Sequence, residues 1–256
     1  MIALISDIHS NLEALNAVLQ NIKDHGGVTK IYCLGDIVGY GPNPLECTEI
    51  IMNCDKTIMG NHEQALLNNA FGFNKVAKQA IQWTRSQLKP SLLGGRKKKA
   101  WKFLKSLKTH FTENNILYVH GSPREPTNEY LTEEAITNAQ NGISTTLDEN
   151  FALMDKICFM GHTHKPGVIT NDYKFYNIDD LNYRYTFLDY QKVIVNIGSV
   201  GQPRDNDNRA SYVIYNPVAN EIIFKRVEYD YQTTIAKIEA INNLNNQLGQ
   251  RLSDGA

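Results

Sequence analysis

Acidic and imidazole side chains follow the first apolar run of this sequence. Residues 2–6 read as a buried strand, and Asp7 and His9 come directly after it, two residues apart. Carboxylate oxygen and imidazole nitrogen are ordinary ligands of Mn, Fe and Zn, so both side chains can reach one divalent cation. An Asp-x-His pair by itself is equally typical of a helix cap beside a surface histidine. The rest of the chain must therefore decide between the two interpretations.

The same arrangement recurs along the chain. The polar residues that follow apolar, strand-like runs, most of them beside a glycine, are Asp7, His9, Asp36, Asn61, His120, His162 and His164. In open α/β folds the strand ends meet at one edge of the sheet, which is the usual place for a site. Seven oxygen and nitrogen ligands suit two ions rather than one, with Asp36 able to bridge them. The sequence therefore predicts two divalent metal ions, and Mn, Fe, Zn, Co and Ni all remain candidates.

Alternating strand-like and helix-like segments must position these residues. The periodicity predicts strands at 2–6, 30–34, 57–59, 116–119 and 156–160, and helices near 11–24, 44–52, 73–88 and 97–107, with a polar helix after residue 63 and another from residue 132. Short strands are predicted at 167–170, 174–178, 184–189, 192–197, 210–215 and 221–227, followed by an amphipathic helix from about 231 to 252. Because these strands cluster, we expect a second sheet packed on the first. No linker divides residues 1–256, which favours a single domain.

Composition narrows the class of protein. The 256 residues fit one large α/β domain or two small ones, and the net charge of -1 disfavours a nucleic-acid binder or a membrane-surface protein. Cys33, Cys47, Cys54 and Cys158 form no C-x-x-C pair, a pattern that suits a reducing cytosol. The apolar start is too short for a membrane span. We therefore expect a cytoplasmic protein without a membrane partner, and the sequence does not indicate its oligomeric state.

Five motifs in order resemble those of the calcineurin-like metallophosphoesterases. They are Asp7-Ile8-His9, Gly35-Asp36, Gly60-Asn61-His62-Glu63, His120-Gly121 and Gly161-His162-Thr163-His164. The resemblance runs over residues 7–164, and the strand-rich segment 166–228 fits the second sheet of that family's fold. It implies an α/β fold in which a two-sheet β-sandwich is flanked by helices, in four layers, α/β/β/α.

The resemblance also implies a role for each residue of the motifs. The first metal would be held by Asp7, His9 and His164, the second by Asn61, His120 and His162, and Asp36 would bridge. Two such cations lower the pKa of a shared water, so that hydroxide attacks phosphorus in line. His62 would stabilise the transition state or protonate the leaving oxygen. Glu63 would orient a neighbour or favour the following helix rather than react.

Departures from the family pattern reduce the number of candidate substrate classes. Protein Ser/Thr phosphatases of this superfamily carry phosphate-clamping arginines in GDxxDRG and RGNHE contexts, whereas residues 35–41 and 59–63 contain no Arg here. This disfavours a phosphoprotein phosphatase and a typical symmetrical dinucleoside-tetraphosphate hydrolase, which we keep as alternatives. The stretches GDIVGYGPNP, HGSP and GSVGQPRD are similar to those of compact stand-alone bacterial and archaeal phosphoesterases, often named phosphodiesterases.

Candidate substrate contacts lie in the glycine-rich loops. They are Arg204, Arg209, Arg124 and Tyr40. A guanidinium can meet two phosphate oxygens at once, which makes an arginine near the metals a suitable clamp. The competing interpretation is that Arg204 and Arg209 pair with Asp205 and Asp207 to hold a loop. Tyr40 and Tyr130 are candidates for stacking on a nucleobase, as opposed to packing at the rim.

We therefore expect a dinuclear metal-dependent phosphoesterase that hydrolyses a small phosphodiester or phosphomonoester, with nucleotides among the candidates. A non-catalytic scaffold that recruits a partner protein is the alternative from another class. It would be recognised by a missing metal ligand, and the motifs lack none. A nuclease would need a basic groove, which the neutral charge disfavours.

Overall fold

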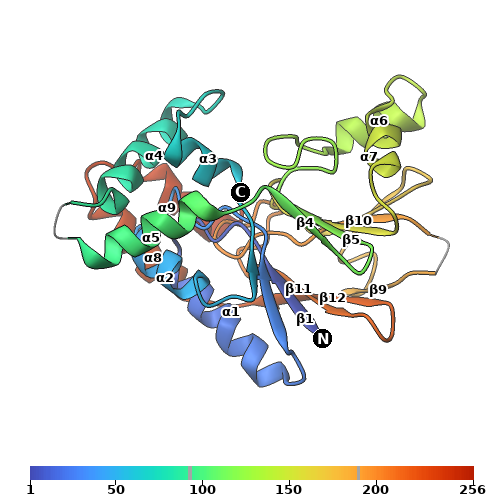
Figure 1. Ribbon diagram of the computed structural model, residues 1–256, viewed down its shortest axis with the longest axis horizontal. Helices are drawn as coiled ribbons and strands as arrows, with labels where there is room; N and C mark the ends of the chain where they lie inside the picture. The colour runs from blue at the N-terminus through green and yellow to red at the C-terminus, as the bar shows by residue number, and fades with distance from the viewer. Residues whose placement is uncertain (92–93, 189–190) are drawn as a thin grey trace.

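Two mixed β-sheets lie face to face between layers of helices in the computed structural model of this chain, which describes residues 1–91, 94–188 and 191–256 (Figure 1). The first sheet has the order β3-β2-β1-β11-β12-β9, with bounds β1 Ile2–Ile5, β2 Lys30–Cys33, β3 Lys56–Thr57, β9 Arg184–Thr186, β11 Ala210–Asn216 and β12 Glu221–Val227. The second has the order β4-β5-β6-β10-β7-β8, with bounds β4 His110–Glu113, β5 Ile116–Val119, β6 Ile157–Met160, β7 Gly167–Thr170, β8 Phe175–Asn177 and β10 Val193–Asn196.

Each sheet contains a parallel trio of strands, β3-β2-β1 in the first and β5-β6-β10 in the second. Because parallel strands end at the same edge, the loops that follow these six strands gather there. Backbone hydrogen bonds join the two edges: Val200 N donates to Ser6 O over 3.0 Å, and Gly201 N donates to Asp7 O over 2.8 Å. Six of the predicted metal ligands lie in these loops, and the seventh, Asn61, is the first residue of α3.

The helices cover the outer faces of both sheets. Their bounds are α1 Leu12–His25, α2 Pro44–Ile51, α3 Asn61–Leu67, α4 Lys75–Leu88, α5 Gly95–Ser106, α6 Glu133–Gln140, α7 Thr146–Ala152, α8 Tyr231–Glu239 and α9 Gln247–Asp254. Apolar residues of α1, α2 and α5 pack on the first sheet, and those of α6 and α7 pack on the second. None of the described helices has the length and apolar character needed to cross a membrane.

Successive side chains of a strand point to opposite faces of the sheet and so belong to different layers of the core. In β1, Ala3 and Ile5 face the core under α1 and α2, while Leu4 faces the second sheet together with Phe159 and Val195. Because β1 is covered on both faces, its sequence is a continuous apolar run rather than an alternating one. The layers are thus α/β/β/α, which confirms the predicted fold class.

Some predicted elements differ from the observed ones. The helix predicted over 231–252 is two helices, α8 and α9, separated by the asparagine-rich segment 240–246, because asparagine side chains favour turns over helix interiors. Strand β4 and helix α7 were not predicted; β4 is a short edge strand with alternating exposure. The strand predicted over 184–189 is observed over Arg184–Thr186, and residue 189 lies outside the described residues.

Candidate metal centre

The seven predicted ligands converge at the shared edge of the two sheets. All are buried: Asp7 and His9 follow β1, Asp36 follows β2, Asn61 opens α3, His120 follows β5, and His162 and His164 follow β6. We call these seven residues the metal centre, a candidate site. Following the predicted grouping, we call Asp7, His9 and His164 its first ligand group, and Asn61, His120 and His162 its second. Ligand atoms of the first group lie within 4.8 Å of one another, as do those of Asp36 with His120 and His162.

The first ligand group leaves a carboxylate oxygen without a partner. Asp7 Oδ2 accepts from the His162 backbone N–H over 3.0 Å, whereas the buried Asp7 Oδ1 accepts no hydrogen bond from the described residues. His164 Nε2 lies 3.1 Å from Asp7 Oδ1 and 3.2 Å from His9 Nε2. An unsatisfied buried carboxylate oxygen is costly, and a cation among these three atoms would satisfy it.

Asp36 lies between the two ligand groups. Its Oδ1 accepts from the His62 backbone N–H over 2.8 Å, which turns Oδ2 toward the histidines. That oxygen lies 3.3 Å from His120 Nε2 in the second group and 3.7 Å from His9 Nε2 in the first. His120 Nε2 is in turn 3.0 Å from Asn61 Oδ1. One carboxylate oxygen therefore faces ligands of both groups.

Backbone carbonyls orient the imidazole rings. The Nδ1 atoms of three histidines each face a carbonyl oxygen: His9 faces Val38 (3.2 Å), His120 faces Leu34 (2.8 Å) and His164 faces Gln202 (2.5 Å). With Nδ1–H donating, the Nε2 lone pair of each ring is left for a cation whenever the ring is neutral. His162 is turned the other way, because its Nε2 faces Asn128 O at 3.1 Å. Its Nδ1 is therefore the available ligand atom.

Five residues of the metal centre adopt left-handed backbone conformations. The φ angles are 54° at Asp7, 47° at His9, 51° at Asp36, 67° at His162 and 62° at His164. This conformation costs a residue with a Cβ about 1–2 kcal/mol, so contacts with the surrounding structure must stabilise it. Such strain gathers where side chains must be aimed at a ligand, and it supports a functional role for this edge.

Glu63 holds the loops of the metal centre together. Its buried carboxylate accepts from the backbone N–H groups of Asp36 (2.8 Å), Gly60 (2.9 Å) and Val38 (3.1 Å). Burial, with a contribution from Asp36, raises the pKa of Glu63 to about 7. The carboxylate thus orients its neighbours and caps α3, in agreement with the sequence-based interpretation.

Most imidazole rings at this edge favour the neutral form, because burial lowers their pKa. Burial lowers the pKa of His162 to about 3 and that of His62 to about 4, and it also lowers the pKa of His9 and His164. His120 differs: burial opposes its charge, yet Asp36 raises its pKa to about 9. Because a cation needs a free lone pair, the neutral rings are ready ligands, whereas His120 must first lose a proton.

His62 lies beside the metal centre. Its Nε2 is 3.9 Å from Asp36 Oδ2, and its buried Nδ1 has no partner among the described residues. The ring makes edge contacts with His9, Tyr40 and Phe73, at centroid distances of 4.6, 4.5 and 5.0 Å. It is therefore held in one orientation with a ring nitrogen free.

The three predicted arginine contacts behave differently. Arg204 lies near the centre, with its guanidinium carbon 6.0 Å from the Tyr40 ring centroid and its buried Nε without a partner among the described residues. Arg209 instead binds Asp207, with Nη2 2.6 Å from Oδ2, and Arg124 forms ion pairs with Glu129 and Glu149. The structure therefore brings only Arg204 of the three to the centre. The predicted alternative of a loop-holding pair applies to Arg209; Asp205 pairs with Arg226 rather than with Arg204.

A second arginine near Tyr40 was not singled out from the sequence. Arg251, on α9, is half-buried, and burial together with the positive charge of Arg204 lowers its pKa. Arg204 Nη2 donates to Gln202 Oε1 over 2.8 Å and Arg251 Nε donates to Ala256 O over 2.6 Å, and neither guanidinium pairs with an Asp or Glu side chain of the described residues. Only the break between α8 and α9 brings Arg251 here, and no motif marks it.

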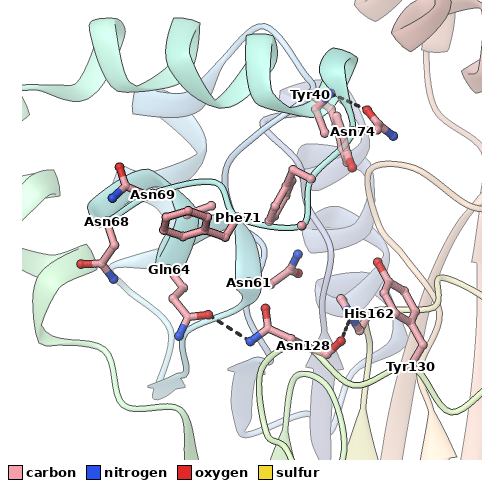
Figure 2. A pocket seen from close by; sticks show the side chains of 14 residues that line it. Tyr40, Asn61, Gln64, Asn68, Asn69, Phe71, Asn74, Asn128, Tyr130 and His162 are labelled. Atoms are coloured by element: carbon pink, nitrogen blue, oxygen red, sulfur yellow. Dashed lines mark hydrogen bonds between the residues drawn. The ribbon is translucent and has the colours of Figure 1, made fainter.

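An open pocket lies over the second ligand group. Asn61 and His162 line its floor, and Tyr40 and Tyr130 stand at one side (Figure 2). The Tyr130 ring stacks on the His162 ring, with centroids 3.7 Å apart. Both tyrosines singled out from the sequence are therefore beside the centre.

Comparison with known proteins agrees with this geometry. A model of the calcineurin-like phosphoesterase superfamily domain matches residues 1–219. An uncharacterized protein of Methanocaldococcus jannaschii is 41% identical over 268 residues, which cover 98% of this chain and 97% of that protein. A crystal structure of a metallophosphoesterase from Sphaerobacter thermophilus is 35% identical, with a TM-score of 0.78 over 100% of this chain and 98% of the other. A shorter match, 31% identical over 75 residues, joins 28% of this chain to 27% of a symmetrical bis(5'-nucleosyl)-tetraphosphatase of Actinobacillus succinogenes.

Proposed function

The chain belongs to the calcineurin-like phosphoesterase superfamily, and from this premise we propose that it is a dinuclear metal-dependent phosphoesterase acting on a small phosphodiester or phosphomonoester. One observation carries the proposal: Asp36 Oδ2 lies 3.3 Å from His120 Nε2 and 3.7 Å from His9 Nε2. A single carboxylate that faces two sets of nitrogen and oxygen donors is what a bridged pair of cations requires.

The donor set fits two divalent cations. The first ligand group would hold one cation and the second the other, with Asp36 shared between them. The unpartnered Asp7 Oδ1 supports this assignment, because a cation would satisfy an oxygen that the described residues leave without a hydrogen bond. When bound, the cations supply Lewis acidity that lowers the pKa of water and polarises phosphoryl oxygens. Mn, Fe, Zn, Co and Ni all suit such donors.

His62 is the proposed catalytic side chain outside the ligand groups. Its backbone N–H binds Asp36 and its ring is fixed by aromatic neighbours, so the ring does not need to be ordered when substrate arrives. A neutral imidazole keeps one N–H, which can donate to a phosphoryl or leaving oxygen. Contributions of about 10²–10⁴-fold are typical of such groups.

Arg204 and Arg251 are the proposed phosphate contacts. The positive charge of Arg204 contributes to the lowered pKa of Arg251, and both guanidinium groups act electrostatically on Tyr40. Neither group pairs with an Asp or Glu side chain of the described residues. Mutual repulsion of this kind is relieved when an anion binds between the two groups. A phosphate oxygen offers a charge-assisted hydrogen bond to either guanidinium.

A dinucleoside polyphosphate hydrolase is the second candidate. The match to a symmetrical bis(5'-nucleosyl)-tetraphosphatase favours it, although it spans only 28% of this chain. A protein Ser/Thr phosphatase is supported less, because segments 35–41 and 59–63 carry no arginine. A non-catalytic scaffold would have no need of all seven ligands.

We further propose that residues 1–256 act as one domain in the cytosol. The Thr234 hydroxyl lies within hydrogen-bond distance of Asn11 Oδ1 (3.0 Å) and Glu13 Oε2 (2.9 Å), which ties α8 to the N-terminal end of α1 and supports one unit. The four cysteines are free thiols, which suits a reducing compartment.

Reconstitution with single metals tests the proposal. Metal-free protein is loaded separately with Mn, Fe, Zn, Co or Ni and assayed on bis-p-nitrophenyl phosphate and p-nitrophenyl phosphate. We expect hydrolysis with at least one metal and its loss in Asp36→Ala. Asp155→Ala removes an exposed carboxylate in the loop before β6 and serves as the matched control. Activity that survives Asp36→Ala, or no hydrolysis with any of the metals, contradicts the proposal.

A further inference from the structure

The pocket over the metal centre has the size and position of a substrate site. Its volume is about 730 Å³, within the range of small-molecule sites. The residues that line it are Tyr40, Asn61, Gln64, Ala65, Asn68, Asn69, Phe71, Gly72, Phe73, Asn74, Ala77, Asn128, Tyr130 and His162. Because Asn61 and His162 also belong to the metal centre, a phosphate held there would direct one ester group into this pocket.

The chemistry of the lining disfavours a charged group in the part of the pocket that lies beyond the metal centre. No Asp, Glu, Lys or Arg lines the pocket, whereas six side-chain amides and four phenyl or phenol rings do. A second phosphate would need cations, and an ammonium group would need carboxylates. Amides and aromatic rings together suit a neutral, flat group that carries hydrogen-bond donors and acceptors at its edge.

Phe71 offers a largely exposed aromatic ring. It is 84% exposed, and Tyr130 is 49% exposed. Among the described residues these are the only aromatic members of the exposed large hydrophobic set, and both line this pocket. Figure 2 shows Phe71 among the side chains that surround the pocket, above Gln64 and Asn128 in that view. Bases stack on such rings whatever their sequence, for about 1–3 kcal/mol each.

Two amides from different segments are coupled at the other side of the pocket. Asn128 Nδ2 donates to Gln64 Oε1 over 3.1 Å (Figure 2). The bond fixes both side chains and leaves an acceptor, Asn128 Oδ1, and a donor, Gln64 Nε2, without partners in the described part of the chain. Every nucleobase edge presents donors and acceptors of this kind.

We propose that this pocket binds a nucleobase and that the substrate is therefore a nucleotide ester, an inference that rests on the proposed phosphoesterase function. For a nucleoside phosphodiester, water supplies the oxygen that bonds to phosphorus. The phosphorus–oxygen bond to the leaving alcohol breaks, and the proton passes to that oxygen or to solvent. The products are a nucleoside monophosphate and an alcohol.

Three diesters with the same p-nitrophenyl leaving group test the inference. Their second ester group is methyl, phenyl or thymidine 5'-yl, so the methyl ester tests the reaction, the phenyl ester adds stacking, and the thymidine ester adds a base edge. For the metal-loaded protein we expect kcat/KM to rise in that order. The thymidine ester should exceed the methyl ester by about 10-fold or more, the equivalent of one base–aromatic stack.

Two variants separate stacking from hydrogen bonding. Phe71→Ala should lower the thymidine-to-methyl ratio of kcat/KM by about 10-fold. Asn128→Ala should lower the thymidine-to-phenyl ratio by about 2- to 10-fold, the usual loss for a hydrogen bond to a neutral group. Ile143→Ala truncates a side chain that is 72% exposed and lies outside the pocket, so it should change neither ratio. Circular dichroism checks that each variant is folded.

The outcomes distinguish this inference from the proposed function. Equal kcat/KM for the thymidine and phenyl esters, or an unchanged thymidine-to-methyl ratio in Phe71→Ala, overturns the nucleobase assignment while hydrolysis itself persists. Inactivity on all three esters contradicts the phosphoesterase function instead. In that case, saturation-transfer NMR of thymidine with the metal-free protein tests whether the pocket binds a nucleobase. Binding that Phe71→Ala weakens supports the inference, and absence of binding overturns it.

Discussion

Replacing Gly60 with alanine tests the position of Asp36 without removing any side chain of the metal centre. A Cβ at residue 60 would lie 2.1 Å from Asp36 Oδ1 and 2.4 Å from Asp36 N. Since non-bonded atoms settle near 3.5 Å, Asp36 must move by roughly 1 Å. Metal–ligand distances tolerate only about 0.2 Å. Gly60→Ala should therefore disturb the bridging carboxylate by several times that tolerance.

The expected losses follow from this displacement. A misplacement of about 1 Å at a reacting centre costs around 100-fold in rate, so we expect at least that loss in kcat/KM on bis-p-nitrophenyl phosphate. The hydrogen bonds from Asp36 N and Gly60 N to Glu63 should also be strained in this variant. Overpacking of this kind lowers the free energy of unfolding by about 1–3 kcal/mol. Metal content by mass spectrometry and thermal unfolding by circular dichroism measure the two effects separately.

Gly95→Ala is the matched control, because a Cβ at the first residue of α5 meets no atom of the described residues within 4 Å outside its own helix and chain neighbours. Alanine is also the better helix former, so this variant should be neutral or slightly more stable. If Gly60→Ala keeps its metal content and stays within about threefold of the wild-type kcat/KM, the inference that Asp36 must hold this position is refuted.

Further predictions concern the residues around the centre. His62→Ala should lower kcat by about 10²–10⁴-fold with an unchanged metal content, and loss of metal instead would make His62 a ligand. Arg204→Ala should raise KM about 10- to 100-fold, whereas Arg209→Ala, whose guanidinium is held by Asp207, should leave KM within twofold; equal effects of the two would contradict the assignment. Because Asp36 raises the pKa of His120 to about 9, His120 is protonated in the metal-free protein at pH 7.5 and metal binding should release one proton. Apparent metal affinity should then rise about tenfold per pH unit up to about pH 9 and level off above it. Calorimetric titration in buffers of different ionisation enthalpy measures the proton count, and a count of zero would contradict the charge state.

The strand-end motifs made the convergence of the seven candidate ligands predictable from sequence. Asp7, Asp36 and His120 each follow a short apolar run, and chain order alone places the ends of parallel strands at one edge. The four-layer fold followed from the family resemblance together with the cluster of short strands after residue 166. Both inferences depend on local pattern, which a sequence displays directly.

Features that depend on tertiary contacts were not predictable. Nothing in the residue types shows that the carbonyl of Leu34 faces His120 Nδ1, because backbone orientation is a property of the folded loop. Arg124 and Arg204 looked alike in sequence, and only the fold pairs Arg124 with Glu129 and Glu149. Arg251 was missed because the C-terminal segment was predicted as one continuous helix.

Anomalous scattering from crystals of the metal-loaded protein tests the central claim most directly. Data collected at the absorption edge of the bound metal should show two peaks about 3.5–4 Å apart, one in each ligand group, with Asp36 between them. A single peak, or two peaks that do not share Asp36, would contradict a bridged dinuclear centre.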